Sequence, residues 1–187
     1  VEFFKLLERN IKKMQEFTEQ CEHRKNTTKV VLTKNNSKSL VDIPDESIDI
    51  VITSPPYGDS RTTVAYGEFS RLSLQWLDIF EIPDKEIMSI DKSFMGGMKY
   101  RNGFEFDVKS KKLQESLNKI QEIDIERAGD VYSFYSDLNE AMASIASKCR
   151  HGSYQFWVVG NRTVKGEKLK TDEIIAELAQ AHNLEHV

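Results

Sequence analysis

The sequence predicts an α/β fold with a mostly parallel sheet, and three observations support this. Segments rich in β-branched and aromatic residues occur at 29–33, 48–53 and 154–160. Amphipathic helical patterns lie between and around them, in the order expected of crossover helices packed on a parallel sheet. The run 48–53 is nearly all β-branched, which is typical of a strand buried on both faces of such a sheet.

The helices are expected where apolar residues recur at steps of three and four. These patterns cover 2–20, 69–80, 113–120, 135–145 and 172–182. Trp76 and Trp157 follow the helical and strand periods, so we expect both in the core. Residues 84–109 have no clear period, and the glycine-containing basic run 95–101 is expected as an exposed loop or as part of an insertion within 84–128.

Composition limits the classes of protein. The chain has 187 residues, of which 39% are hydrophobic, so it can bury one substantial core and is expected to be a single domain. The net charge of -4 argues against a cationic surface throughout but leaves room for a local basic cleft. The apolar stretches are too short for a membrane span or signal peptide, so we expect a cytoplasmic protein.

Metal binding and disulfides are not expected. Cys21 and Cys149 lie far apart without a Cys-x-x-Cys spacing, as in a reduced intracellular protein. The four histidines form no metal-ligand pattern with them.

Polar segments follow all three predicted strands. Ligands of parallel sheets bind beyond the carboxyl ends of the strands. The segments Asn35-Asn36, 54–57 and Asn161-Arg162 lie at such ends, so we expect them to converge on one edge of the sheet.

The most informative segment is Thr53-Ser54-Pro55-Pro56-Tyr57. Two prolines directly after a strand cannot continue a ladder, and each fixes its φ near about -65°. The residue before a proline is held extended, so the loop is stiff and its carbonyl oxygens point in set directions. Tyr57 offers a flat face on which a nucleobase can stack.

This loop suits the alkylation of an exocyclic amine. Such a nitrogen is a poor nucleophile because its lone pair is delocalised into the ring. Oxygens of Ser54 and Pro55 that accept the two amine hydrogens favour a more tetrahedral nitrogen and stabilise its developing positive charge. A base inside a duplex must first be flipped out of the stack.

The segment from Asp45 to Gly58, with its β-branched strand and Ser-Pro-Pro-Tyr loop, resembles the catalytic region of amino-group DNA methyltransferases. The resemblance implies a Rossmann-like methyltransferase sheet, S-adenosylmethionine as cofactor, DNA as partner and a place in restriction-modification. Its catalytic residues are Ser54, Pro55, Pro56 and Tyr57. A serine preceded by threonine is commoner in the cytosine-N4 branch, and adenine-N6 methylation remains the alternative.

The resemblance also assigns residues outside this loop. Asn35 and Thr53 are expected to contact the cofactor, although Asn35 is equally well explained as a turn cap. The segment 158–166 is similar to a later strand and loop that wall the target-base pocket. As a group, basic and polar side chains near this edge are expected to contact DNA: Arg61, Asn161, Arg162 and Lys165, with Lys99 and Arg101 nearby. Taken one by one, the basic residues are better explained as a solvated face.

The glycine-rich Phe-x-Gly-x-Gly cofactor loop of this family is not found in the sequence. We therefore expect a partial catalytic domain over 1–187, incomplete on its N-terminal side, that associates with a missing or separate segment carrying that loop. The other hypotheses are a non-catalytic module that binds nucleic acid or a partner chain, and methylation of RNA or of a protein amide. A docking motif for WW domains or a hydrolase nucleophile at Ser54 is weakly supported.

Overall fold

The computed structural model describes residues 2–22, 28–33, 36–59, 66–77, 83–98, 100 and 105–187. Contacts divide the chain into two units, Val1–Lys34 and Asn35–Val187. We describe each unit by itself.

The first unit contains one long helix, α1 (Glu2–Glu22), which confirms the helix expected there. Its apolar side chains are solvent-exposed within this unit. The strand expected at 29–33 is wrong, because residues 28–33 form no strand and Val30, Val31 and Leu32 are exposed. A strand needs a neighbour that pairs its backbone groups, and the described residues provide none for this segment.

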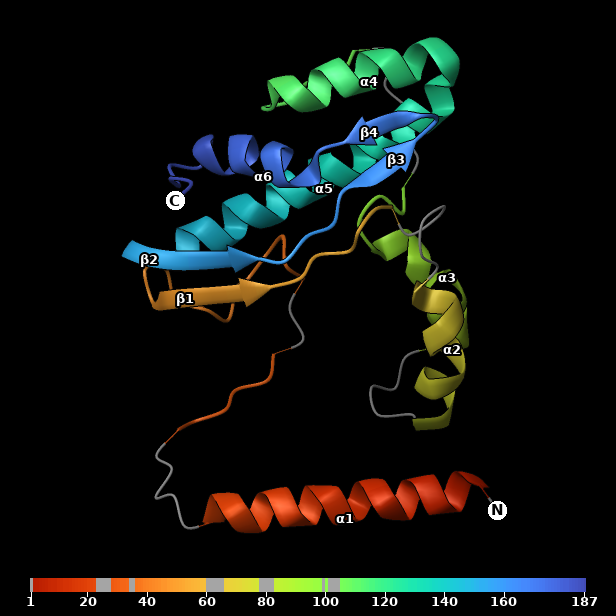
Figure 1. Ribbon diagram of the computed structural model, residues 1–187, viewed down its shortest axis with the longest axis vertical. Coiled ribbons are helices and arrows are strands. Elements are labelled where there is room, and N and C mark those ends of the chain that lie inside the picture. The colour runs from red at the N-terminus through yellow and green to blue at the C-terminus, as the bar shows by residue number, and fades with distance from the viewer. Residues whose placement is uncertain are drawn as a thin grey trace. The chain divides into compact units, whose positions relative to one another are not determined.

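A parallel pair of strands organises the second unit (Figure 1). The strands are β1 (Ile48–Thr53) and β2 (Cys149–Trp157), so both were predicted, but β2 starts and ends earlier than the expected 154–160. Their pairing runs from Ile50 opposite Tyr154 to Thr53 opposite Trp157, with an irregularity before Ile50. The two carboxyl ends therefore lie side by side.

The sheet is covered on one face. Trp157 and Val159 pack against the helical core, as expected for Trp157. Ile52, 77% exposed, and Ile50 point to the other face with Tyr154 and Phe156. The expectation that β1 is buried on both faces is therefore wrong for the part of the chain that the structure describes, because no described element of this unit covers that second face.

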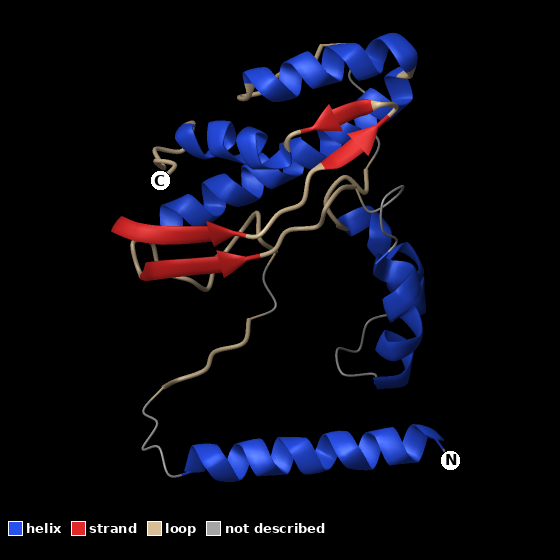
Figure 2. Cartoon of the chain, viewed as in Figure 1, coloured by secondary structure: helices blue, strands red, loops and turns tan. Residues whose placement is uncertain are grey.

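Three predicted helices build the core: α4 (Lys111–Ile123), α5 (Ile125–Lys148) and α6 (Thr171–Gln180). Figure 2 shows them gathered on one side of the parallel strands. Ser110 and Asp124 cap α4 and α5 by accepting hydrogen bonds from the backbone N–H groups of Leu113 and Arg127. Fully buried residues of these helices include Leu113, Leu117, Ile120, Val131, Leu138, Met142, Ile174 and Leu178. Helix α4, which falls in the range 84–128 expected to hold an insertion, is thus part of the core.

A β-hairpin that the sequence did not predict follows β2. Its strands are β3 (Arg162–Val164) and β4 (Glu167–Leu169), paired antiparallel. The two turn residues, Lys165 and Gly166, have φ values of 49° and 84°. Positive φ at both positions is the geometry of the two-residue turns that match the twist of a hairpin. The turn therefore sets the orientation of Lys165.

Helix α2 (Tyr66–Leu77) confirms the helix expected in this region. Trp76 is 91% exposed, so its expected core position is wrong. The aperiodic region contains α3 (Asp84–Ser89) and the 3-10 helix η1 (Ile90–Ser93), neither of which was predicted. Gly96 and Gly97 are buried rather than part of an exposed loop. Among the described residues, no helix has the length and apolar character needed to cross a membrane.

Candidate active site at the carboxyl ends of the parallel strands

The Pro-Pro-Tyr loop leaves the sheet directly at the end of β1. Val158 donates its backbone N–H to the carbonyl oxygen of Thr53 across 2.9 Å, so the parallel ladder extends to the residue before Ser54. Pro55 is buried, whereas Ser54 is exposed and Tyr57 is 49% exposed. The loop thus has a buried proline that anchors it and two side chains, on either side, that face solvent.

Tyr57 lies beside the loop that follows β2. A Cβ atom placed on Gly160 would be 3.8 Å from Cδ1 of Tyr57, an ordinary van der Waals distance. The two loops expected to converge, 54–57 and the one that contains Asn161, therefore meet at Tyr57 and Gly160. Because Gly160 has no side chain, the ring edge of Tyr57 stays uncovered at that point.

Two residues beyond Tyr57, the carboxylate of Asp59 is completely buried. Its Oδ2 lies 3.1 Å from Nη1 of Arg127 on α5 and 3.5 Å from Nη1 of Arg162 on β3. Arg127 also pairs with Asp130 at 3.3 Å. These groups carry two charges of each sign, and pairing of this kind offsets the cost of removing a carboxylate from water.

Gly96 packs against the same aspartate. A Cβ atom at Gly96 would lie 2.6 Å from Cβ of Asp59 and 3.1 Å from its Cα, closer than real Cβ contacts allow. The φ of Gly96 is 67°, which glycine adopts at little cost. Its N–H donates to Oδ2 of Asp137 on α5 at 2.8 Å. The end of the Pro-Pro-Tyr loop is therefore held between α5, β3 and the glycine turn.

Asp59, Arg127 and Gly96 were not identified from the sequence. The two arginines lie 68 and 103 residues from Asp59 along the chain. Nothing in their local sequence marks them as partners. The one feature of the sequence that could have pointed to Asp59 is its position two residues after Tyr57.

The predicted DNA contacts have different surroundings. Asn161 is exposed, and its Oδ1 lies 3.5 Å from the backbone N of Asp172. Lys165 is exposed and forms an ion pair with Asp124 at 2.9 Å. The side chain of Arg162 is only 11% exposed, and its guanidinium lies 5.6 Å from the centre of the Phe134 ring. Arg61 lies outside the described residues, as do Lys99 and Arg101.

The surroundings of Arg162 act on its pKa in opposite directions. Burial lowers the pKa of this guanidinium from its usual value, while Tyr135 and Asp59 raise it. An arginine still stays charged in such a setting, because its ordinary pKa is far above neutral. Arg162 therefore presents its charge to Asp59.

Of the predicted cofactor contacts, Thr53 is the last residue of β1 and is half-buried. Its carbonyl oxygen accepts the backbone N–H of Val158 at the end of β1. Asn35 lies outside the described residues. The adjacent Asn36 accepts a hydrogen bond from the backbone N of Lys38 at 3.0 Å, the turn-forming role that was the alternative for Asn35.

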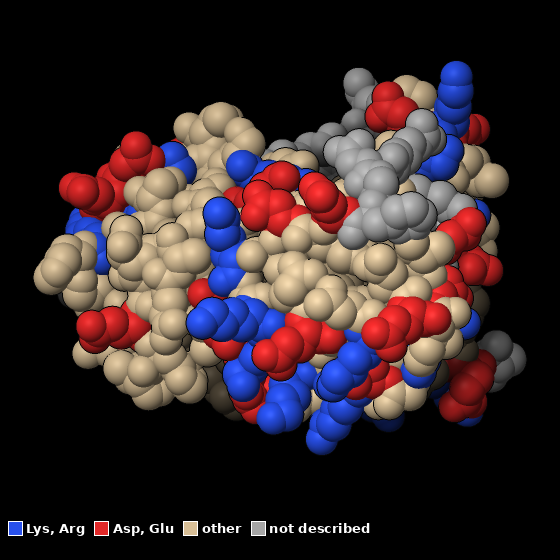
Figure 3. Space-filling view, turned by 90° about the horizontal axis from the view of Figure 1, so that it is seen from above, with Lys and Arg blue, Asp and Glu red and all other residues tan. Residues whose placement is uncertain are grey.

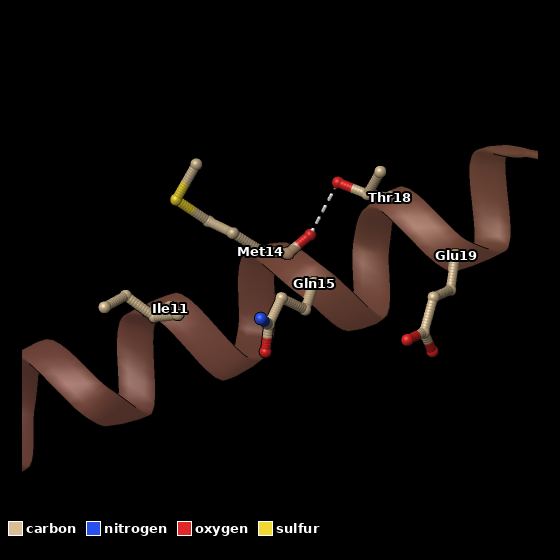
Figure 4. A pocket seen from close by; sticks show the side chains of 5 residues that line it. All are labelled: Ile11, Met14, Gln15, Thr18 and Glu19. Atoms are coloured by element: carbon tan, nitrogen blue, oxygen red, sulfur yellow. Dashed lines mark hydrogen bonds between the residues drawn. The ribbon is translucent and has the colours of Figure 1, made fainter.

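Other surfaces carry less information about function. Figure 4 shows a pocket lined entirely by one helix, with Ile11, Met14, Gln15, Thr18 and Glu19 of α1 around it. On the face drawn in Figure 3, acidic and basic side chains lie interspersed. Within the described ranges, no group of three or more His, Cys, Asp or Glu residues is arranged to hold a metal ion.

Comparison with known proteins supports the methyltransferase class. The chain is similar to a curated Type II methyltransferase, with 41% identity over 192 residues that include 100% of this chain. That relative is M.MvaI of Kocuria varians, and the chain spans 42% of its length. No family model matches the sequence. No solved structure matches it either.

Proposed function

We propose that this chain is the catalytic part of a site-specific DNA methyltransferase of a restriction-modification system, which methylates the exocyclic N4 amine of cytosine. The observation that carries the proposal is the loop 54–57. It leaves the carboxyl end of a parallel strand with Ser54 exposed and Tyr57 half-exposed. Adenine N6 is the alternative target, since its amine has the same two hydrogens and needs the same acceptors.

The chemistry follows from the position of the acceptors. The Ser54 hydroxyl and the Pro55 carbonyl accept the two amine hydrogens, which turns the nitrogen lone pair out of the base plane. Tyr57 stacks on the flipped base and holds its plane, an interaction typically worth about 1 to 3 kcal/mol. When bound, S-adenosylmethionine would supply an electrophilic methyl group: the amine nitrogen would form the N–C bond as the C–S bond breaks, and one amine proton would pass to water.

Thr53 is the described residue that we propose for the cofactor site. The half-buried Thr53 hydroxyl stands next to Ser54, so a cofactor that contacts it lies within reach of an amine bound at the loop. We propose Thr53 and Asn35 as its contacts, together with the glycine-rich loop of an associated segment.

We propose that Asn161, Lys165 and Arg61 contact DNA on the rim of the site. Asn161 and Lys165 are exposed, and a phosphate that displaces Asp124 from Lys165 gains a charge-assisted hydrogen bond. Arg162 has little exposed surface for a phosphate, so we propose that it supports the loop through Asp59.

The decisive experiment uses the protein as its gene encodes it. Labelled S-adenosylmethionine is incubated with unmethylated DNA, and the nucleosides are then separated. Label in N4-methylcytosine supports the proposal, and label in N6-methyladenine supports the alternative. Parallel reactions with RNA and with protein test those substrates. Absence of label from DNA, with wild-type protein that is folded, would leave the non-catalytic module as the better hypothesis.

A further inference from the structure

The feature that the proposed chemistry does not use is the buried carboxylate of Asp59. It lies two residues after Tyr57 and is 0% exposed, so it cannot touch a substrate at the rim. A buried carboxylate without partners is strongly unfavourable, because it loses its hydration. Its burial therefore has to be explained by what it binds.

Among the described residues, two guanidinium groups pair with Asp59, and they come from α5 and β3. Arg127 lies in the first turn of α5, the longest helix of the core, and its side chain is 17% exposed. Arg162 opens β3, directly after the loop that contacts Tyr57. A single oxygen, Oδ2 of Asp59, faces both cations. The carboxylate thus ties the Pro-Pro-Tyr loop to α5 and to the neighbouring loop at once.

The glycine turn also packs against Asp59. Gly96 leaves no room for a side chain between itself and Asp59. Because ionic contacts and close packing hold Asp59, the loop has one fixed point at Thr53, in the sheet, and a second at Asp59. Ser54 and Tyr57 lie between these two points.

We propose that Asp59 is a positioning residue, whose ion pairs with Arg127 and Arg162 hold Ser54 and Tyr57 in the geometry that amine methylation needs. This inference rests on the proposed function for its effect on activity, but the loop geometry itself does not depend on it. A displacement of about 1 Å at a reacting centre typically lowers the rate about 100-fold. Removal of the Asp59 charge therefore slows the chemical step far more than it weakens DNA binding.

The test compares Asp59→Asn with Glu177→Gln. Both exchange a carboxylate for an amide of similar shape. Glu177 binds Ser110 and the backbone N of Lys112, away from the loop. We expect Asp59→Asn to lower kcat about 10- to 100-fold, with the KM for DNA changed less than about threefold. Glu177→Gln is expected to keep kcat within about twofold when both variants are assayed well below their unfolding temperatures.

A second readout does not require activity. Hydrogen exchange of the peptide that covers residues 51–59 is expected to be faster in Asp59→Asn than in wild-type protein, and unchanged in Glu177→Gln. An inactive wild-type protein with this exchange pattern would reject the proposed function while supporting the anchoring of the loop. Unchanged exchange and unchanged kcat in Asp59→Asn would overturn the inference.

A double variant separates a local effect from general instability. If Asp59 acts through Arg127, then Asp59→Asn combined with Arg127→Gln is expected to lose about as much kcat as either change alone. Strictly additive losses would contradict this coupling. If Asp59→Asn does not fold, Arg127→Lys is tested in its place, because lysine keeps the positive charge but lacks the planar guanidinium group. Wild-type exchange at 51–59 in that variant would then overturn the inference.

Discussion

Val158 donates its backbone N–H to Thr53, and this bond carries the parallel ladder one residue beyond the end of β2. Thr53 is therefore fixed by the sheet, and the chain turns into the loop from a set position. The positions of Ser54 and Tyr57 relative to the sheet are restricted as well, because Pro55 and Pro56 leave the backbone between them little freedom.

The oxygen of Ser54 is predicted to act in the transition state. Ser54→Ala removes a hydrogen-bond acceptor for the amine, so we expect kcat for methyl transfer to fall about 10- to 100-fold, with the KM for DNA nearly unchanged. The measurement is steady-state transfer of labelled methyl groups to DNA. The exposed Ser89 on α3 provides the control, Ser89→Ala. Wild-type kcat in Ser54→Ala would remove the proposed role of this hydroxyl.

Tyr57 is predicted to contribute its ring rather than its hydroxyl. Tyr57→Phe keeps the stacking face, and we expect it to retain most activity. Tyr57→Ala loses about 1 to 3 kcal/mol of stacking, which corresponds to a fall of about 5- to 150-fold in kcat/KM. Both variants should have the same urea midpoint of unfolding as wild-type protein, since the Tyr57 side chain is half-exposed. Equal losses in the two variants would contradict a stacking role.

Gly96 is predicted to be intolerant of any side chain. Gly96→Ala adds a Cβ atom against Asp59, at a positive φ, whereas Gly152 has a φ of 79° with open space around it. Gly152→Ala therefore measures the backbone strain alone. We expect Gly96→Ala to lose about 1 to 3 kcal/mol more free energy of unfolding than Gly152→Ala, as measured by urea denaturation. Equal losses would mean that the turn can move away from Asp59.

The helical core is predicted to dominate stability. Leu117 is fully buried on α4, so Leu117→Ala should lower the free energy of unfolding by about 2 to 5 kcal/mol through lost burial and the cavity left behind. Leu72 on α2 is largely exposed, so Leu72→Ala should change the free energy of unfolding by less than about 0.5 kcal/mol. Chemical denaturation followed by circular dichroism tests both. A similar loss in the two variants would place the stabilising contacts elsewhere.

Glu177 is predicted to contribute to acid sensitivity. Burial raises the pKa of this carboxyl, but hydrogen bonds from Ser110 and the backbone of Lys112 outweigh it, and the pKa falls below its usual value of 4.5. A lowered pKa in the folded state stabilises the protein above the unfolded pKa, and this contribution is lost as the pH falls through the folded value.

Glu177→Gln should therefore be less stable than wild-type protein at pH 7, by about 1 to 2 kcal/mol. The difference should shrink below about pH 4. Urea denaturation at several pH values measures it. A difference that stays constant with pH would show that packing, and not the charge, is responsible.

The local elements followed from local patterns. The period of three and four residues predicted α1, α4, α5 and α6, because a helix buries one face whatever its partner is. The β-branched run 48–53 likewise predicted β1. The position of the loop 54–57 directly after β1 was also predictable, since proline restricts its backbone without help from the rest of the fold.

Tertiary structure decided which of these elements pair, which side chains are buried and which distant residues are in contact. Val30–Leu32 has the composition of a strand, yet it forms none, since a strand also requires a partner for its backbone. Trp76 follows a helical period but is exposed. The pairing of Asp59 with Arg127 and Arg162 joins residues far apart in the chain, so no local pattern encodes it. The sequence by itself determined that a stiff loop follows β1, and only the folded chain determined what holds that loop in place. The reason is that long-range contacts depend on how the helices and the sheet pack together.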